Sequence, residues 1–374
     1  MRAHVDRHEL ADPGDASGLA AAIAAGTVDA RDIVAVIGKT HGNGLVNDYT
    51  RAHLTLVLSG AIARATGETR ETVAARVPFI FSGGCEGVLS PHYVVLSVDR
   101  TAPPGVPGRP ALAIGTALST AMAVADIGRE AQVAATAAAV REAMAAARIE
   151  RPQDVHFVQV KGPARTGEAI AASAAAGRPA VAGDANRLMA WGRVACAFGV
   201  ARALGEATAD ETAEAAMFRD YAVRSDVASI SAGVEVDCNE VVVIGMSAAW
   251  SGPLAIAHRP MADALDIGAV YAVLRDVGLD ASPQVAPAER DRLRAVFVKC
   301  EPQRDGRVRG RRHTMLDDGD INAQRHIRGA VGALVAGVLG ETAIFVSGGA
   351  EHQGPDGGGL VAVIAERADG LTPP

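Results

Sequence analysis

Residues 80–86 read IFSGGCE, residues 229–235 read SISAGVE, and residues 345–351 read FVSGGAE. All three stretches fit the pattern Ser-x-Gly-x-Glu, with serines at Ser82, Ser231 and Ser347. Each serine follows a short apolar run, and a second apolar run of the kind expected for a buried strand comes after each copy. A motif that occurs three times in one order predicts three units of similar architecture.

Each copy is preceded by another apolar run that ends in a lysine. These runs are DIVAVIGKT, VHFVQVKGP and AVFVKCE, with lysines Lys39, Lys161 and Lys299. Between lysine and serine lies a helix-like stretch that carries one arginine near its start, namely Arg51, Arg193 or Arg325. Each stretch closes with Gly-Glu, which is typical of a helix that ends at a glycine cap.

The fold class predicted from this repeat is α/β. We expect three similar α/β units around a pseudo-threefold axis, with a central β-barrel-like core and helices outside. Proline- and glycine-rich residues 99–111 and the stretch 246–260 are read as breaks. The units then span residues 1–103, 111–248 and 254–374. Lysine and serine lie 43, 70 and 48 residues apart, so the middle unit carries an insertion.

Composition excludes several classes of protein. The 374 residues carry a net charge of −7 and only 3% aromatic residues. A nucleic-acid binder would show a basic face and stacking aromatics, and no window is apolar enough to span a membrane. The four cysteines form no CxxC pair, which argues against a zinc finger. We therefore expect a cytoplasmic protein that binds neither nucleic acid nor membrane.

The repeated residue types suit nucleophilic catalysis. A serine hydroxyl needs a neighbouring base, and a buried lysine near a cation can be neutral enough to serve as that base. Arginine supplies the cation and can clamp a carbonyl oxygen. The glycine-containing turn lets backbone N–H groups approach a developing oxyanion. Taken singly, such a lysine is more often a surface cation and such a serine a simple turn. The turn glutamates are expected to bond their own backbone.

Three such sets predict one central site for a small, nearly threefold ring with alternating carbonyl and N–H groups. The reaction can occur at only one point of such a ring, so the symmetry must break. The middle unit differs most, because it has the largest lysine-to-serine spacing, a Ser-Ala-Gly turn, and Ser229 beside Ser231.

At these residues the chain resembles the cyanuric acid hydrolase and barbiturase family of ring-opening cyclic amide hydrolases. The resemblance rests on IGKTHGNGLVNDYTR, SGGCEGVLSPH, VHFVQVK, SISAGVE, RRHTMLDDGDIN and SGGAEHQGPDGGG. It implies three units around a pseudo-threefold axis and a homotetramer. It also implies that Ser231 is the nucleophile and Lys161 its general base.

The resemblance further implies the residues that hold the substrate. These are Arg51, Ser82, Gly83, Arg193, Ala232, Arg325, Ser347, Gly348, Lys39 and Lys299. No organic cofactor is implied. A structural metal site is implied at Glu301, Ala350, Gln353, Gly354, Pro355 and Gly358. One carboxylate with backbone carbonyls suits a hard cation such as Mg²⁺.

Several alternatives stay open. Cyanuric acid is placed ahead of barbituric acid as substrate, but Met189 and Trp191 near the middle arginine depart from the expected pattern and leave another cyclic imide or ureide possible. A hypothesis of a different class is a non-catalytic protein that binds a small molecule in the same pocket. A serine-lysine amidase for linear amides is a weaker alternative, because three arginines suit a ring better than a chain.

Overall fold

The computed structural model describes residues 1–106 and 108–368, and contains three four-stranded sheets with the same strand order. The first sheet has the order β1-β4-β2-β3, with β1 (Arg2–Glu9), β2 (Ile33–Thr40), β3 (Phe79–Gly83) and β4 (His92–Asp99). The second has the order β5-β8-β6-β7, with β5 (Ala111–Leu118), β6 (Val155–Pro163), β7 (Ala228–Gly233) and β8 (Glu240–Ser247). The third has the order β9-β14-β10-β13, with β9 (Leu254–Met261), β10 (Leu293–Cys300), β13 (Phe345–Ser347) and β14 (Gly359–Glu366). Residues 369–374 of the expected third unit lie outside the described residues.

The strands predicted from the repeat have the same partners in all three sheets. The lysine strands β2, β6 and β10 run parallel to the serine strands β3, β7 and β13. They run antiparallel to the strands that follow, β4, β8 and β14. The first strand of each unit was not predicted. In β1, charged residues surround the buried Ala3 and Val5, as is usual for an edge strand with one wet face.

The predicted barrel-like core takes a different form. Within the described residues the three sheets are separate hydrogen-bonded sets, so no closed barrel is formed. Their inner faces instead share one apolar core, to which Val94, Ile114 and Phe297 contribute from the three sheets. The core is built mainly from valine, isoleucine, leucine and alanine, so burial of side chains rather than a continuous ladder joins the units.

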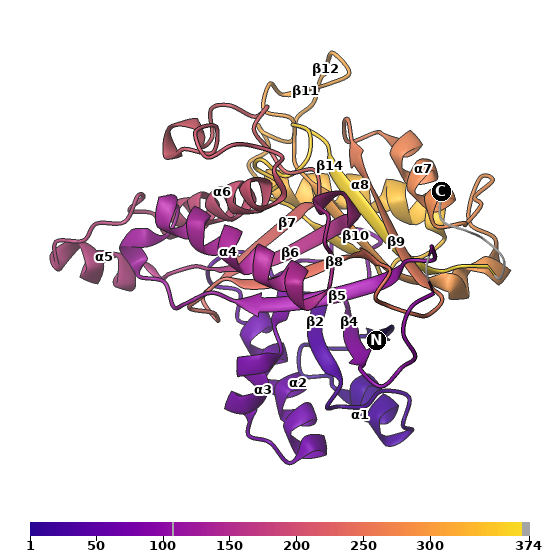
Figure 1. Cartoon of the computed structure of the whole chain (residues 1–374). Helices are drawn as coiled ribbons and strands as arrows, with labels where there is room; N and C mark the ends of the chain where they lie inside the picture. Colours follow the sequence, from indigo (N-terminus) through magenta and orange to yellow (C-terminus); the bar gives the residue numbers. More distant parts are fainter. Residues whose placement is uncertain (107, 369–374) are drawn as a thin grey trace.

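Helices cover the outer faces of the sheets (Figure 1). The first unit has α1 (Ser17–Ala24), α2 (Thr50–Thr66) and α3 (Arg70–Arg76). The second has α4 (Glu130–Ala146), α5 (Gly167–Ala175) and α6 (Ala185–Leu204), and the third has α7 (Ile267–Asp276) and α8 (Ala323–Leu339). The predicted helix ends are confirmed, because α2, α6 and α8 stop at left-handed Gly67, Gly205 and Gly340. None of the helices in the described part of the chain is both long and apolar enough to cross a bilayer.

Shorter elements complete the chain. These are the 3₁₀ turns η1 (Val124–Asp126), η2 (Pro152–Asp154), η3 (Glu214–Ala216) and η4 (Pro287–Arg292), and a hairpin of β11 (Arg307–Val308) and β12 (Arg311–Arg312). The insertion in the middle unit comprises α5 and the irregular segment after α6.

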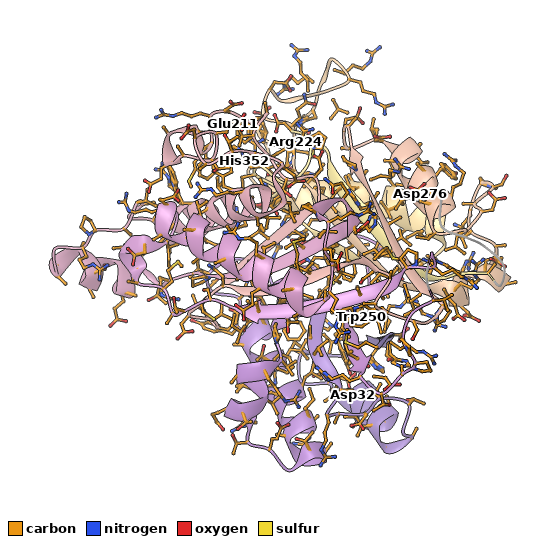
Figure 2. The ribbon with its side chains drawn as sticks, in the orientation of Figure 1. Asp32, Glu211, Arg224, Trp250, Asp276 and His352 are labelled. Carbon is orange, nitrogen blue, oxygen red and sulfur yellow. The ribbon has the colours of Figure 1, made fainter. Side chains whose placement is uncertain are left out.

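The break predicted at residues 246–260 is shorter in the structure, where residues 248–253 connect β8 to β9 and β9 occupies the second half of the stretch. The short connection before β9 is anchored by Trp250, which is only 1% exposed (Figure 2). Its indole Nε1 donates to the Ala147 carbonyl at 2.6 Å. A buried tryptophan at the junction therefore fastens the second unit to the third.

Close packing of β5 against α4 makes Gly115 a sensitive position. A Cβ atom at Gly115 would lie 2.0 Å from the Ala143 carbonyl oxygen, a backbone atom that cannot turn aside. We expect Gly115→Ala to lower the free energy of unfolding by about 1–3 kcal/mol, as overpacking of a core does. Urea-induced unfolding measures the change. Gly167→Ala is the matched control, since a Cβ there meets no atom within 4 Å. Equal stability of the two variants would contradict this account of the packing.

Candidate active site

The three lysines lie opposite the three serines in the sheets. The parallel ladders pair Lys39 with Ser82, Lys161 with Ser231, and Lys299 with Ser347. Residues that are partners in a ladder project to the same face of the sheet, and all three lysines are fully buried. The repeated motif thus produces three equivalent lysine–serine positions.

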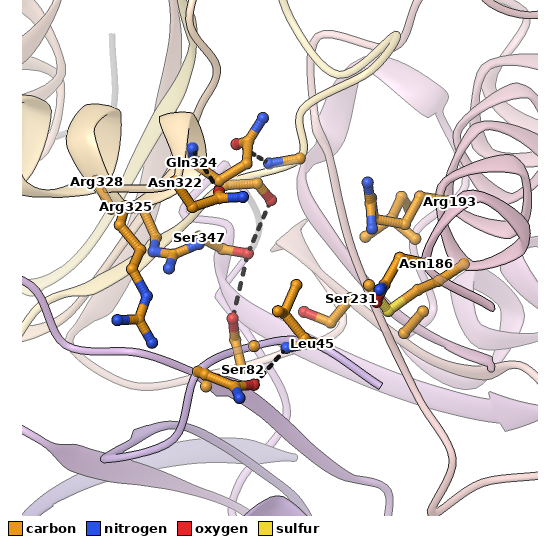
Figure 3. Close-up of a pocket in the computed structure, with 18 of the residues that line it drawn as sticks. Leu45, Ser82, Asn186, Arg193, Ser231, Asn322, Gln324, Arg325, Arg328 and Ser347 are labelled. Carbon is orange, nitrogen blue, oxygen red and sulfur yellow. Dashed lines mark hydrogen bonds between the residues drawn. The ribbon is translucent and has the colours of Figure 1, made fainter. Parts of the chain in front are cut away.

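The serine strands end at one shared cavity of about 170 Å³. An apolar cavity of about 150 Å³ can hold benzene, so this cavity is the size of one small ring. Figure 3 shows Ser82, Ser231 and Ser347 facing it, with Arg193 on one side and Arg325 and Arg328 on another. The predicted contacts Arg51, Ser82, Gly83, Arg193, Ser231, Ala232, Arg325, Ser347 and Gly348 all line it, whereas the three lysines do not.

Several lining residues were not predicted. The polar ones among them are Asn43, Asn186, Asn322, Gln324 and Arg328. Two of the asparagines lie at the start of a helix, Asn186 in α6 and Asn322 as the cap of α8. The position of an asparagine just before a helical stretch is a usable signal for such residues. Of the two bulky residues expected near the site, Met189 lines the cavity, but Trp191 packs edge-on against Phe218, 5.0 Å between ring centroids.

The two outer lysines are bonded to their own serines. Lys39 Nζ lies 3.2 Å from Ser82 Oγ, and Lys299 Nζ lies 3.1 Å from Ser347 Oγ. Burial and then nearby Arg328 lower the pKa of Lys39 to about 8. Burial and then Arg193 lower the pKa of Lys299 to about 7. Removal of an ammonium from water is the dominant cause in both cases.

Lys161 has different partners. Its Nζ donates to the Phe81 carbonyl at 2.7 Å and lies 2.6 Å from Glu235 Oε1 in an ion pair. No hydrogen bond joins Lys161 to Ser231 among the described residues, although the two face each other in the ladder. Burial lowers the pKa of Lys161, Glu235 opposes the shift, and Arg51 adds to it. Among the described residues, the middle lysine therefore pairs with a carboxylate where the outer two bond their serines.

The arginines act across the boundaries between units. Each pairs with the glutamate of the next unit's turn: Arg51 with Glu235 (3.3 Å), Arg193 with Glu351 (2.5 Å), and Arg328 with Glu86 (2.6 Å). The expectation that these glutamates bond the backbone of their own turns is confirmed for Glu235 and Glu351, whose own backbone N–H groups help to lower their pKa. The sequence did not indicate the additional arginine partner from another unit. The cation beside each lysine also comes from the preceding unit rather than from the lysine's own unit. This cyclic arrangement makes the site depend on all three units at once.

The arginine of α8 that joins this cycle is Arg328. It lies twelve residues before the glycine that ends its helix, as Arg193 does in α6. The predicted Arg325 also lines the cavity, but it is exposed and forms no such ion pair in the described residues. The distance to the capping glycine thus relates Arg328 to Arg193, although Arg51 lies sixteen residues before Gly67 and does not share this spacing.

The strand beside each lysine adds a second difference between units. The ladder partners of Lys39 and Lys161 in the antiparallel neighbour are His92 and Glu240, and that of Lys299 is Leu360. Burial raises the pKa of Glu240 to about 8, which favours the protonated carboxyl group. Only the middle unit places a carboxyl group at this position.

The predicted metal loop lies behind the middle serine. Gln353 Oε1 accepts a hydrogen bond from the Ile230 N–H at 2.7 Å, one residue before Ser231. Glu301 Oε1 pairs with Arg304 at 2.5 Å, but its Oε2 is buried and has no partner within the described residues. Burial, and then Glu351, raise the pKa of Glu301 to about 8. A cation beside Oε2 would satisfy that oxygen and favour the ionised carboxylate, so Glu301 suits the predicted metal.

Comparison with known proteins agrees with this arrangement. Residues 4–366 match the family described as amidohydrolase ring-opening protein. A cyanuric acid amidohydrolase of Bradyrhizobium diazoefficiens is 49% identical over 96% of both chains. One of Azorhizobium caulinodans is 46% identical over 98% of this chain and 99% of the relative.

Solved structures give the same result. A cyanuric acid hydrolase described as an evolutionary innovation by structural concatenation superposes with a TM-score of 0.91 at 42% identity, covering 98% of this chain and 99% of that one. The hydrolase from A. caulinodans superposes with a TM-score of 0.89 at 45% identity, with the same coverage. Together with the three buried lysine–serine positions around one cavity, these matches show that the chain belongs to the family of ring-opening amidohydrolases.

Proposed function

We propose that this enzyme opens the ring of cyanuric acid by hydrolysis, with Ser231 as nucleophile and Lys161 as general base. The observation that carries the proposal is the ring-sized cavity into which three units send serines and arginines. A ring with three carbonyl groups and three N–H groups matches this threefold set of donors and acceptors. Relatives at 46–49% identity are named for the same reaction.

The first step is attack by Ser231 Oγ on one ring carbonyl carbon while Lys161 Nζ takes the hydroxyl proton. The Lys161 ammonium must first lose its proton to become a neutral amine, and its lowered pKa favours that neutral state. The carbonyl oxygen becomes an oxyanion, for which the Ser82 and Ser347 hydroxyls and the Ala232 N–H are candidate donors around the cavity.

The second step breaks the ring C–N bond. The leaving ring nitrogen takes the proton from Lys161, and the opened ring stays attached to Ser231 Oγ as a carbamate ester, because the attacked carbon keeps its bond to the second ring nitrogen. Water then attacks this ester with Lys161 again acting as base, which releases the product and restores the serine hydroxyl. One water is consumed, and no oxidant or reductant is needed.

The arginines have donors left for the ring oxygens. In Arg193 and Arg328, Nε and Nη2 are bonded to glutamates, so Nη1 of each is available to a ligand. Arg51 donates instead to the Ala232 and Leu45 carbonyls, which fixes the wall beside Ser231. We propose that Arg193 and Arg328 bind the ring oxygens and that the exposed Arg325 contacts the substrate where the cavity opens to solvent.

A panel of cyclic imides and ureides tests the function. The purified protein is incubated with cyanuric acid, barbituric acid, smaller cyclic imides and a linear amide, and loss of ring ultraviolet absorbance is followed. We expect consumption of cyanuric acid above all others. Preferential turnover of barbituric acid would change the assigned substrate but leave the proposed reaction type unchanged. Binding without consumption of any ring would favour a non-catalytic binding protein and overturn the proposal.

We also propose that the loop behind Ser231 holds a structural Mg²⁺. Glu301 would supply a carboxylate oxygen, and the loop residues Ala350, Gln353, Gly354, Pro355 and Gly358 would supply the other oxygens. The role of the ion would be to fix this loop, which is bonded to the strand that carries Ser231.

A homotetramer is the assembly we propose, and sedimentation analysis measures it.

Removal of the ion should therefore destabilise the fold. We expect a chelator to lower the melting temperature and added Mg²⁺ to restore it, because a ligand bound only to the folded state stabilises it. Glu301→Gln should remove this response, since the amide is a weaker ligand for a hard cation. Glu289→Gln, a partly exposed carboxylate remote from the loop, is the control. A melting temperature that changes neither with chelator nor with added Mg²⁺ would exclude a structural ion.

A further inference from the structure

The three lysine–serine pairs rest on side chains of different kinds. We compare the ladder pair that lies two residues before each lysine and serine, on the same face of the sheet. In the first unit this pair is Ile37 with Ile80. Phe297 with Phe345 stand there in the third. In the middle unit the equivalent pair is Gln159 with Ser229. The support beneath Ser231 is thus polar where the other two supports are apolar.

The polar pair is deeply buried. Gln159 is 0% exposed and Ser229 is 1% exposed. Gln159 Oε1 and Ser229 Oγ both lack a hydrogen-bond partner in the described part of the chain. Burying such groups costs free energy that isoleucine or phenylalanine would not incur. Packing alone therefore gives no reason for a glutamine and a serine at this position.

Gln159 reaches the middle serine. Its Nε2 lies 3.5 Å from Ser231 Oγ and 3.3 Å from the Val160 carbonyl oxygen. The outer serines have no such neighbour, because Ser82 and Ser347 are bonded to lysine ammonium groups and lie 3.4 Å from each other. Gln159 is the side chain that bonds Ser231 Oγ in the described structure.

We propose that Gln159, supported by Ser229, is a positioning residue that makes Ser231 the reactive serine of the three. This inference rests on the proposed function. An amide N–H that donates to Oγ occupies one lone pair of the hydroxyl and leaves its hydrogen free to point elsewhere. When Lys161 turns from Glu235 toward the serine, that hydrogen is available for transfer. An apolar residue at position 159 would leave the hydroxyl free to rotate.

The test replaces the amide without changing side-chain length. In Gln159→Met we expect kcat for cyanuric acid to fall about 10–100-fold, the effect of a misplaced reacting group, while KM changes less than about threefold. Melting temperature should hold, because the substitution also removes an unpaired buried oxygen. Gln159→Asn, whose amide is one methylene too short to reach Oγ, should lose kcat similarly and serves if the methionine variant does not fold.

Ile37→Met is the matched control, because it places the same side chain beneath Ser82, and its kcat should stay within about twofold of the parent. In a Ser231→Ala background, Gln159→Met should leave the Kd of cyanuric acid unchanged, since no nucleophile remains to be positioned. A kcat within twofold of the parent for both position-159 variants, or an equal loss in Ile37→Met, overturns the inference. If the parent consumes no ring at all, the proposed function fails first, and the two failures are distinguished.

Discussion

Replacement of Ser231 by alanine should abolish turnover of cyanuric acid, with a loss in kcat of about 10⁴-fold or more, as removal of a serine nucleophile causes in other hydrolases. The covalent route needs an oxygen at this position, and alanine leaves only the remaining donors of the cavity. The fold should persist, because the change removes a single oxygen from a side chain that is already 6% exposed at the cavity. Initial rates from ultraviolet absorbance, with thermal unfolding as a check, measure both effects.

The equivalent variants of the other two serines are the controls. Ser82→Ala and Ser347→Ala should keep measurable kcat and lose about 10–100-fold in kcat/KM, because each removes one donor to a ring oxygen or oxyanion. Ser347 is the alternative nucleophile to be tested, since Lys299 Nζ lies 3.1 Å from Ser347 Oγ and the pKa of Lys299 is lowered to about 7. An active Ser231→Ala enzyme beside an inactive Ser347→Ala enzyme would transfer the nucleophile to the third unit. Equal, total loss in all three would contradict the division of roles.

Much of the site could be predicted because each lysine and its serine end successive apolar runs, and this order is visible in the sequence. A lysine that ends one apolar run and a serine that ends the next become ladder partners when the two strands are parallel. A helix between two strands is the usual connection of that kind, and its glycine end is visible in the sequence. Three repeats of the pattern then determine three similar sheets.

The remaining features depend on contacts between units. Nothing local to Arg51 indicates that it approaches Glu235, because the two residues belong to different sheets and meet only after the units pack. The same holds for the cation beside each lysine. The absence of a closed barrel in the described residues is likewise a matter of how sheet faces meet. The environment of His352 is another such contact, because this residue of the third unit is 1% exposed and its ring bonds the Val223 carbonyl of the middle unit.

Lys161→Met should lower kcat about 10²–10⁴-fold, the range attributed to a positioned general base. Methionine keeps the length of the side chain and removes the proton acceptor. Glu235 does not become an isolated buried charge, because Arg51 still lies 3.3 Å away, so the protein should remain folded. In the parent enzyme kcat should rise with pH as the Lys161 ammonium loses its proton. Since burial lowers the pKa of this group, the rise should lie below the ordinary lysine pKa of 10.5.

The lysines of the other units separate base catalysis from the general effect of removing a buried cation. Lys39→Met and Lys299→Met remove equally buried ammonium groups that donate to serines at the cavity wall. They should weaken ring binding, and therefore raise KM, while kcat keeps its rise with pH. In Lys161→Met the residual rate should lose that rise, because the titrating group is gone. A pH profile unchanged in Lys161→Met but abolished in Lys299→Met would place the base in the third unit, beside the serine to which it is already bonded.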